Sequence, residues 1–258
     1  MEKNIHYFFP SNFKNKRKMN LSNNKILITG GASGIGLGLT ERFIQEGNTV
    51  IICGRRESVL KEVSDKFPAV ITKVCDLSTE AERTELYNWV AENHADLTVL
   101  VNNAGIQNYM NVTDENFYQK ATEEITTNVL APIHLTSLFS NLTSLKTIIN
   151  VTSGLSFVQI AKMPVYCATK SFFHSFTIST RHLLKAKNIE VIEMIPPALN
   201  TDLGGKGLHD YAPPVSEFIE SVFQQMKDGK TELTFGMSEM LANASPEEIK
   251  ITFNKMNQ

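Results

Sequence analysis

The chain has 258 residues, 42% of them hydrophobic, and a formal net charge of −2 at pH 7. This length supports one sizeable core, and the near-neutral charge gives no electrostatic basis for binding nucleic acid or an anionic membrane. No apolar run approaches the ~20 residues of a membrane span, the six histidines show no metal-ligand spacing, and the three cysteines form no C-x-x-C pair. We therefore expect a cytoplasmic protein with reduced thiols, no metal ion, no membrane span and no nucleic-acid partner.

Residues 1–20 differ in character from the rest of the chain. A short apolar run that ends at Pro10 precedes a basic cluster, Lys14–Lys18, and neither shows helical or strand periodicity. The apolar run is too short for the core of a signal peptide. We expect residues 1–20 to be a disordered arm, or to result from an upstream start codon used in place of Met19. Residues 21–258 are then expected to form a single domain.

The first predicted strand, Lys25–Thr29, leads into a glycine-rich turn and then into a helix predicted over residues 34–46. The turn has the spacing G-x-x-x-G-x-G rather than the commoner G-x-G-x-x-G. Glycines let the backbone approach a phosphate closely, and a helix N-terminus supplies free N–H groups. A strand before and a helix after therefore favour a dinucleotide site over a tight turn without a ligand. The residues expected to contact the dinucleotide here are Gly30, Ala32, Ser33, Gly34, Ile35 and Gly36.

Arg55 and Arg56 follow the second predicted strand, residues 48–53. An acidic residue here, about twenty positions beyond the glycines, would bind the adenosine ribose hydroxyls of NAD, but none is present. A guanidinium group can instead hold the 2′-phosphate of NADP through two hydrogen bonds. The two arginines therefore favour NADP(H) over NAD(H). The alternative is that they only begin a solvated helix, predicted over residues 56–66.

Strands and helices alternate along the remainder, which predicts a parallel sheet covered on both faces. The fold class is therefore α/β, a Rossmann-like doubly wound sheet of seven parallel strands. In the sixth strand Glu193 is surrounded by apolar residues, so a carboxylate buried there would need a partner that the sequence does not identify. The third predicted strand ends at residues 76–78, and the later strands span residues 97–101, 147–151, 189–195 and 231–235. The other predicted helices span residues 79–93, 114–141, 165–187 and 214–227.

Tyr166 and Lys170 lie one turn apart on the predicted helix 165–187, and therefore on the same helix face. Free tyrosine titrates near ~10, so ionising it at pH 7 costs roughly 4 kcal/mol. A fixed positive charge about 4 Å away, at an effective dielectric constant near 20, offsets about that much. Such a pair can therefore make a tyrosine that exchanges a proton near neutrality. Taken alone, the same spacing also fits a surface helix with an unrelated Tyr and Lys.

Taken together, these motifs and several others in the same order resemble the short-chain dehydrogenase/reductase family, over roughly residues 25–203. Within that family, the runs 50–55, 164–170 and 193–197 are most similar to DltE-type bacterial oxidoreductases. Ser153 precedes Tyr166 by thirteen residues, which is the family's spacing. The resemblance implies catalytic roles for Asn128, Ser153, Tyr166 and Lys170. It also implies cofactor contacts from Asp76, Leu77, Asn103, Ala104, Gly105, Tyr166, Lys170, Leu199 and Thr201.

The activity that the resemblance implies is interconversion of a small-molecule carbonyl compound and a secondary alcohol, with NADP(H) favoured over NAD(H). Two alternatives remain: an NAD-dependent version of the same enzyme, and a non-catalytic dinucleotide-binding sensor or scaffold. The family also implies a homodimer or homotetramer. Residues 204–214 lie where the family places its substrate loop, and they equally fit an ordinary mobile loop.

Overall fold

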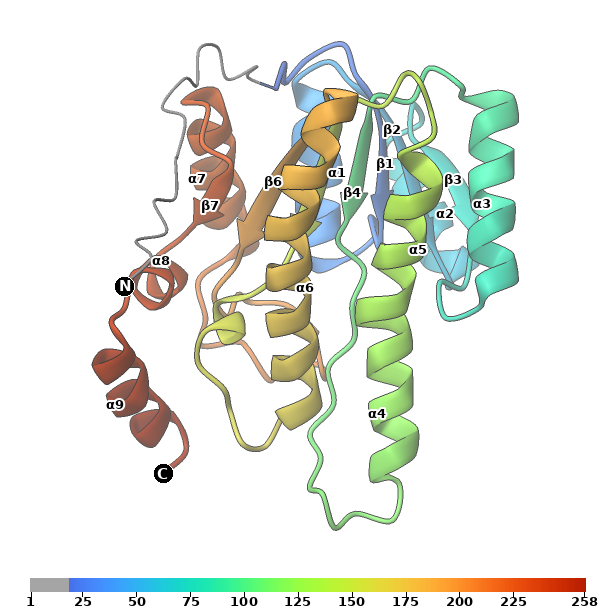
Figure 1. Ribbon diagram of the computed structural model, residues 1–258. Helices are drawn as coiled ribbons and strands as arrows, with labels where there is room; N and C mark the ends of the chain where they lie inside the picture. Colours follow the sequence, from blue (N-terminus) through green and yellow to red (C-terminus); the bar gives the residue numbers. More distant parts are fainter. Residues whose placement is uncertain (1–18) are drawn as a thin grey trace, which may run out of the picture.

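The computed structural model describes residues 19–258. Seven strands form one parallel sheet in the order β3-β2-β1-β4-β5-β6-β7 (Figure 1). This confirms the predicted doubly wound α/β fold. The strands are β1 (Lys25–Thr29), β2 (Thr49–Gly54), β3 (Ile71–Val74), β4 (Val99–Asn102), β5 (Thr147–Val151), β6 (Glu190–Ile195) and β7 (Glu232–Thr234).

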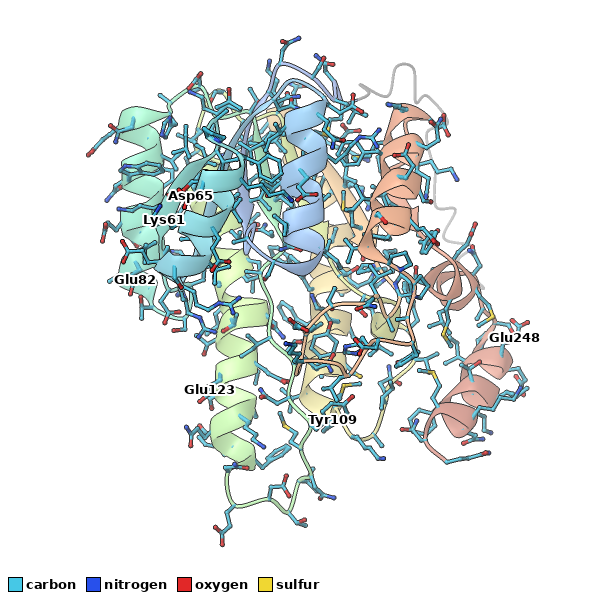
Figure 2. All side chains as sticks on the ribbon, turned by 180° about the vertical axis from the view of Figure 1, so that it is seen from behind. Lys61, Asp65, Glu82, Tyr109, Glu123 and Glu248 are labelled. Atoms are coloured by element: carbon cyan, nitrogen blue, oxygen red, sulfur yellow. The ribbon has the colours of Figure 1, made fainter. Side chains whose placement is uncertain are left out.

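Helices cover both faces of the sheet. Helices α3, α5 and α6 lie on one face in Figure 1, and α1, α2 and α7 lie on the opposite face, which is turned toward the viewer in Figure 2. The helices are α1 (Gly34–Gln45), α2 (Glu57–Lys66), α3 (Glu80–Asn93), α4 (Phe117–Ile125), α5 (Ala131–Phe139), α6 (Pro164–Leu183), α7 (Val215–Lys227), α8 (Met237–Ala242) and α9 (Pro246–Met256).

The central strands read as continuous apolar runs because both of their faces are buried. In β1, Ile26 and Ile28 belong to the core cluster beneath α1 and α7, whereas Leu27 points into the cluster beneath α3 and α5. Phe43 of α1 and Phe223 of α7 pack with their ring centroids 4.8 Å apart and link these two helices over the sheet. The alternation of side chains along each strand therefore holds two separate helix layers on one sheet.

The predicted helix 114–141 is interrupted. It consists of α4, a π-helical turn (Thr126–Leu130) and α5. Pro132 explains the interruption, because it has no N–H to donate to the carbonyl group of Asn128 one turn earlier. Single π-helical turns often occur at functional sites.

Several other boundaries differ from the sequence prediction. Strand β3 ends at Val74, so residues 76–78 follow the strand rather than end it. Helix α6 ends at Leu183 and continues as a 3₁₀ turn over Leu184–Lys187. The sequence analysis does not predict helices α8 and α9, and α9 contributes no buried residue to the core.

Met19 belongs to the folded domain. Its side chain is buried and joins the core cluster beneath α1 and α7, together with Leu21. The expectation that the first twenty residues lie outside the core is therefore wrong at Met19. The rest of that expectation concerns residues 1–18, which lie outside the described part of the chain.

Two kinds of feature are missing from residues 19–258. No helix in this range is both long enough and apolar enough to cross a bilayer. The same residues contain no group of three or more His, Cys, Asp or Glu side chains placed to hold a metal ion.

Candidate active site

The four residues expected to be catalytic converge near the carboxyl end of β5. Asn128, Ser153, Tyr166 and Lys170 are between 2% and 7% exposed. The Lys170 ammonium lies 5.8 Å from the centroid of the Tyr166 ring, and the Tyr166 and Ser153 side chains share a hydrogen bond. The structure therefore places residues from three separate segments around one phenol.

Asn128 sits in the π-helical turn and holds the loop that follows β4. Its Oδ1 accepts the Ile106 N–H at 2.9 Å, and its Nδ2 donates to the Ile106 carbonyl oxygen at 2.8 Å. The same Nδ2 lies 3.2 Å from Oγ1 of Thr169, the residue beside Lys170. Asn128 thus ties the β4–α4 loop to helix α6.

Ser153 has two roles at the start of the short 3₁₀ turn Gly154–Ser156. Its Oγ accepts the Leu155 N–H at 3.1 Å, which caps that turn. Its side chain also hydrogen-bonds to Tyr166. The capping interaction fixes the hydroxyl group beside the phenol, so the capping and catalytic interpretations of Ser153 are compatible.

Burial dominates the electrostatics of Tyr166. Burial raises the pKa of Tyr166 above its ordinary value, and the hydrogen bond with Ser153 lowers it by less. The Lys170 Nζ donates at 2.9 Å to the Val151 carbonyl oxygen and lies 5.8 Å from the centroid of the Tyr166 ring. With this raised pKa Tyr166 is a protonated phenol at neutral pH, and the expectation that Lys170 lowers its pKa stays a prediction.

Lys170 is itself affected by burial, which lowers its pKa to about 8. None of the acidic side chains within residues 19–258 forms an ion pair with it. A lysine in such a position is available for contacts with a polar ligand.

Glu124 is a residue of this region that the sequence patterns did not indicate. It is 0% exposed, it accepts the backbone N–H of Asn108, and its Oε2 has no partner among the described residues. Burial raises its pKa to about 7. After burial and Cys167, its charge is a further cause of the raised pKa of Tyr166. A glutamate one turn before Asn128 gives no sequence signal, because glutamates are common on solvated helices.

The glycine turn after β1 fits a bound phosphate. Gly30 and Gly34 have φ values of 64° and 51°, which favour glycine. A Cβ on Gly36 would lie 2.1 Å from the Gly30 carbonyl oxygen, and one on Gly30 would lie 3.2 Å from Cα of Ala104. Ser33, at the N-cap of α1, makes no side-chain capping bond, so the first N–H groups of this helix remain available to an anion.

The Asn103–Gly105 segment connects the glycine turn to the candidate catalytic residues. Asn103 donates its side-chain N–H to the Thr29 carbonyl oxygen at 2.9 Å, and its backbone N–H to Thr29 Oγ1 at 2.9 Å. A Cβ on Gly105 would lie 3.3 Å from Asn128 Oδ1 and 3.7 Å from Lys170 Nζ. A side chain at Gly105 would therefore fill the space in front of the Asn128 amide and the Lys170 ammonium.

The remaining expected cofactor residues near the turn contribute in different ways. Ala32, Ile35 and Leu199 pack against the core cluster beneath α1 and α7, so they can offer backbone groups only. Thr201 lies beside the start of α1, with its Cγ2 3.4 Å from the position of a Cβ on Gly34. The segment after β6 is thereby placed next to the glycine turn.

Arg55 and Arg56 lie at the exposed carboxyl end of β2. Neither guanidinium group forms an ion pair with another residue in the range 19–258. Asp76 caps its own turn by accepting the Ser78 N–H at 2.9 Å, and Leu77 is buried. All four expected residues follow β2 or β3 at the edge of the sheet that also carries the glycine turn.

Residues 204–214 cover part of this edge. A Cβ on Gly204 would lie 2.9 Å from Nε2 of Gln107, so the segment packs closely on the β4–α4 loop. Gly204 and Gly207 have φ values of 79° and 80°, which other residues rarely adopt. Tyr211, in the same segment, is exposed.

Comparison with known proteins identifies the family. Residues 24–211 match the family described as short chain dehydrogenase. The chain belongs to the short-chain dehydrogenase family. This confirms the resemblance seen in the motifs and places the chain in a family of oxidoreductases.

Individual relatives of this short-chain dehydrogenase agree with that assignment. The oxidoreductase DltE of Bacillus subtilis (strain 168), described as uncharacterized, is 40% identical over 250 residues, which cover 93% of this chain and 98% of DltE. A short-chain dehydrogenase from Burkholderia cenocepacia J2315, solved in complex with NADP, has a TM-score of 0.81 at 22% identity and covers 93% of this chain and 100% of that chain. A relative from Burkholderia phymatum, solved in complex with NAD, has a TM-score of 0.77 at 18% identity, with 91% and 96% covered. At these identities the two solved structures support the fold alone.

Proposed function

We propose that the chain is an NADP(H)-dependent oxidoreductase that interconverts a carbonyl group and a secondary alcohol. The observation that carries this proposal is the buried Tyr166 phenol, which hydrogen-bonds to Ser153 and lies beneath the Lys170 ammonium. The glycine turn after β1 lies at the same edge of the sheet and fits the phosphates of a dinucleotide. The cofactor, when bound, supplies or accepts the hydride.

The four catalytic residues divide the remaining work. Tyr166 holds its proton at neutral pH and donates it to the substrate oxygen during reduction. Ser153 holds that oxygen beside the phenol by a hydrogen bond. Lys170 binds ribose hydroxyls of the cofactor, and Asn128 keeps the β4–α4 loop against α6. In the oxidation direction Tyr166 takes the proton back.

The substrate would enter between two loops. The backbone N–H of Met110 donates to the Lys162 carbonyl oxygen at 3.0 Å, and a cavity of about 410 Å³ lies between these loops. Leu155, Ile160 and Leu203 pack against Tyr166 and its neighbours, which favours a substrate with apolar substituents. Residues 204–214, which follow Leu203, would form the substrate loop.

The direct test is a panel of carbonyl compounds with apolar substituents, assayed by the loss of NADPH absorbance. Reduction of at least one compound is expected, together with the reverse reaction on the corresponding alcohol. A protein that binds NADPH tightly and reduces nothing in a broad panel would instead favour the sensor or scaffold alternative.

A preference for NADPH over NADH is proposed on the basis of Arg55 and Arg56. Both are exposed, both lack ion pairs within residues 19–258, and no acidic residue occupies their place at the end of β2. Among the relatives, one solved structure contains NADP and another contains NAD, so the family alone does not decide. The arginines favour the 2′-phosphate because guanidinium groups bind phosphate through paired hydrogen bonds.

Arg55→Ala is expected to weaken NADPH binding by about tenfold to a hundredfold, the equivalent of a charge-assisted hydrogen bond worth ~1.5–3 kcal/mol. NADH binding should be almost unchanged, since NADH has no 2′-phosphate. Titration of both cofactors by fluorescence measures this. Lys61→Ala on the following helix α2 is the matched control, because Lys61 is paired with Asp65 at 2.7 Å. Equal affinity of the wild type for the two cofactors would contradict the proposal.

We propose a homodimer or homotetramer formed through α4–α6. Exposed apolar side chains gather on these helices: Tyr118, Ile125, Leu130, Phe172, Ile178 and Leu183. Phe173, by contrast, is buried in the chain's own core. A second copy of the chain would cover these residues, since a solvated monomer rarely leaves such a group exposed.

Light scattering at micromolar concentration is expected to give a dimer or tetramer mass. Leu130→Asp should shift the mass toward the monomer, because a carboxylate would be buried in the contact. Met240→Asp, at an exposed apolar residue on α8, is the control and should leave the mass unchanged. A monomer mass for the wild type would refute the oligomer.

The protein is proposed to be cytoplasmic. Cys53, Cys75 and Cys167 are all free and buried. Reduced thiols of this kind suit a reducing compartment.

A further inference from the structure

Helix α6 attaches to the sheet through a row of polar side chains. Lys170 donates to the Val151 carbonyl oxygen at 2.9 Å, His174 contacts Glu193 at 2.9 Å, and Thr177 accepts from Asn150 at 3.0 Å. Positions 170, 174 and 177 follow the helical period, so this row continues the face that carries Tyr166. The face of α6 that carries Tyr166 and Lys170 therefore also makes contacts with the sheet that the catalytic step does not itself require.

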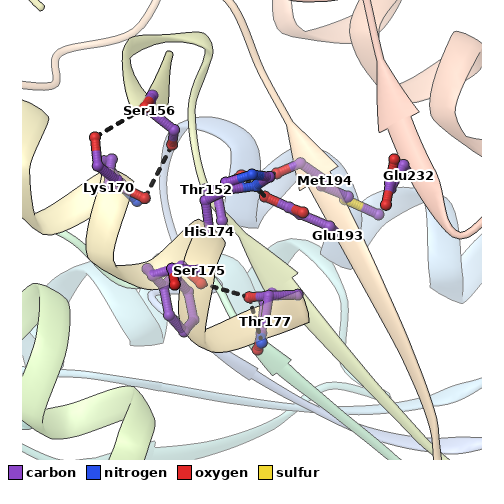
Figure 3. A network of polar contacts seen from close by, with 12 residues as sticks. Thr152, Ser156, Lys170, His174, Ser175, Thr177, Glu193, Met194 and Glu232 are labelled. Carbon is purple, nitrogen blue, oxygen red and sulfur yellow. Dashed lines mark hydrogen bonds and ion pairs between the residues drawn. The ribbon is translucent and has the colours of Figure 1, made fainter. Parts of the chain in front are cut away.

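Glu193 of β6 faces the middle of this row, opposite His174, and is 0% exposed (Figure 3). Its Oε1 accepts the Thr152 hydroxyl at 2.7 Å and lies 2.9 Å from Nδ1 of His174. The Arg181 guanidinium is 4.0 Å from Oε2. These side chains are the partners that the sequence could not identify for a carboxylate inside an apolar strand.

Two of the partners of Glu193, Thr152 and His174, lie next to candidate catalytic residues. Thr152 immediately precedes Ser153 at the end of β5, and His174 is one turn beyond Lys170 on α6. The carboxylate therefore joins the segment that carries Ser153 to the helix that carries Tyr166. The hydrogen bond between Ser153 and Tyr166 depends on the distance between these same two elements.

We propose that Glu193 and His174 form a positioning clamp that holds Tyr166 and Lys170 in register with Ser153. This inference rests on the proposed function for its catalytic consequence, but not for its structural part. The clamp contains a buried carboxylate and a histidine that is 24% exposed on its side chain. The imidazole of His174 is therefore in contact with solvent, whereas the carboxyl group of Glu193 is not.

The surroundings of His174 favour its charged form. Its ring contacts Phe157 at a centroid distance of 4.8 Å and lines a cavity of about 360 Å³ that Glu232, Glu239 and Lys230 also line. The hydrogen bond with Glu193 raises the pKa of His174, against a lowering by burial; Glu232 raises it further, and Arg181 lowers it. On the acidic side of neutrality His174 is therefore an imidazolium.

The sign of the pH effect follows from the raised pKa. Because the folded protein binds this proton more tightly than the unfolded chain, the stabilisation is complete below the ordinary histidine pKa of about 6.5. It is lost as pH rises through the higher pKa of His174 in the folded protein. The free energy of unfolding of the wild type should therefore fall between pH 6 and 9. A variant without an imidazole at position 174 should not show this loss.

Three single variants test the clamp in the full-length chain. Glu193→Gln keeps the size and one acceptor but removes the charge, and His174→Gln keeps an N–H donor but does not titrate. Thr177→Val is the matched control, because it removes a buried hydrogen bond from the same helix without touching the carboxylate. Melting curves from pH 6 to 9, histidine NMR titrations and steady-state kinetics are recorded for each.

For Glu193→Gln we expect kcat to fall about tenfold or more with little change in KM, since a catalytic group misplaced by ~1 Å can cost about a hundredfold. Its His174 pKa should move down toward the ordinary histidine value. Thr177→Val should keep kcat within about threefold of the wild type, even where it lowers the melting temperature as much as Glu193→Gln does. The reason is that the contact between Glu193 and His174 is intact in this variant. A folded Glu193→Gln variant with wild-type kcat, or an equal loss in Thr177→Val, would overturn the proposal.

His174→Gln keeps the proposal testable if Glu193→Gln does not fold. The melting temperature of the wild type should fall relative to this variant by about 2–4 °C between pH 6 and 9. A difference that stays constant over this range would overturn the clamp. If no carbonyl compound is reduced, the proposed function fails, but the His174 titration and the melting curves still decide whether the clamp exists.

Discussion

Tyr166→Phe is expected to bind NADPH almost as tightly as the wild type and to reduce a carbonyl substrate about a thousandfold more slowly, a barrier increase of about 4 kcal/mol. Phenylalanine fills the same space but has no proton to donate. The raised pKa of Tyr166 implies that the wild-type phenol keeps its proton at neutral pH, as a general acid requires. Reduction should therefore lose its proton source while the cofactor site stays intact.

Steady-state kinetics with the best compound of the carbonyl panel, combined with NADPH titration, separates these two effects. Tyr87→Phe is the matched control, since Tyr87 lies on α3, which carries no candidate site residue, and its ring packs edge-on against Phe139 of α5. The control should retain most of its activity. A Tyr166→Phe enzyme that keeps more than about a tenth of the wild-type rate would mean that another group donates the proton.

The fold, and the convergence of the four candidate catalytic residues, could be predicted because their signals are local or occur in a fixed order. Strand β1 and the glycine turn follow each other within the sequence 25–36, and the pair Tyr166 and Lys170 repeats the helical period. Ser153 was found through its spacing from Tyr166. The apolar strands alternate with helices, and this pattern specifies a parallel sheet before any contact is known.

Other properties of the site depend on contacts between distant segments, which no local pattern reports. Whether Lys170 lowers the pKa of Tyr166 depends on where its Nζ points, and here the Val151 carbonyl oxygen holds it. Glu124 resembles a solvent-exposed helix residue until Asn108 is seen to cover it. The partner of Glu193 lies on α6, nineteen residues earlier in the chain.

Lys170→Met is expected to lose both turnover and NADPH affinity without losing stability at pH 7. The loss of affinity should be about tenfold to a hundredfold, because the ammonium is proposed to donate charge-assisted hydrogen bonds to the ribose, each worth ~1.5–3 kcal/mol. Turnover should fall at least as far as in Tyr166→Phe. This combination separates Lys170 from Tyr166, whose variant should lose turnover alone.

The stability expectation follows from the burial of Lys170, which lowers its pKa from 10.5 to about 8. At pH 7 the charged ammonium is therefore less favourable in the folded protein than in the unfolded chain, by on the order of 3 kcal/mol. Methionine removes that cost and fills a similar volume, and it forgoes the hydrogen bond to Val151, worth about 1 kcal/mol. The variant should accordingly melt at or above the wild-type temperature at pH 7.

The pH dependence supplies the decisive measurement. The unfolded chain binds the Lys170 proton more tightly than the folded protein does. The free energy of unfolding of the wild type should therefore rise as pH increases from about 8 to 10.5, whereas that of Lys170→Met should receive no such contribution. The stability advantage of the variant should therefore shrink over that interval in melting experiments on the cofactor-free protein. A variant that melts well below the wild type at pH 7, with a difference that does not change with pH, would show that Lys170 stabilises the fold rather than being held there for function.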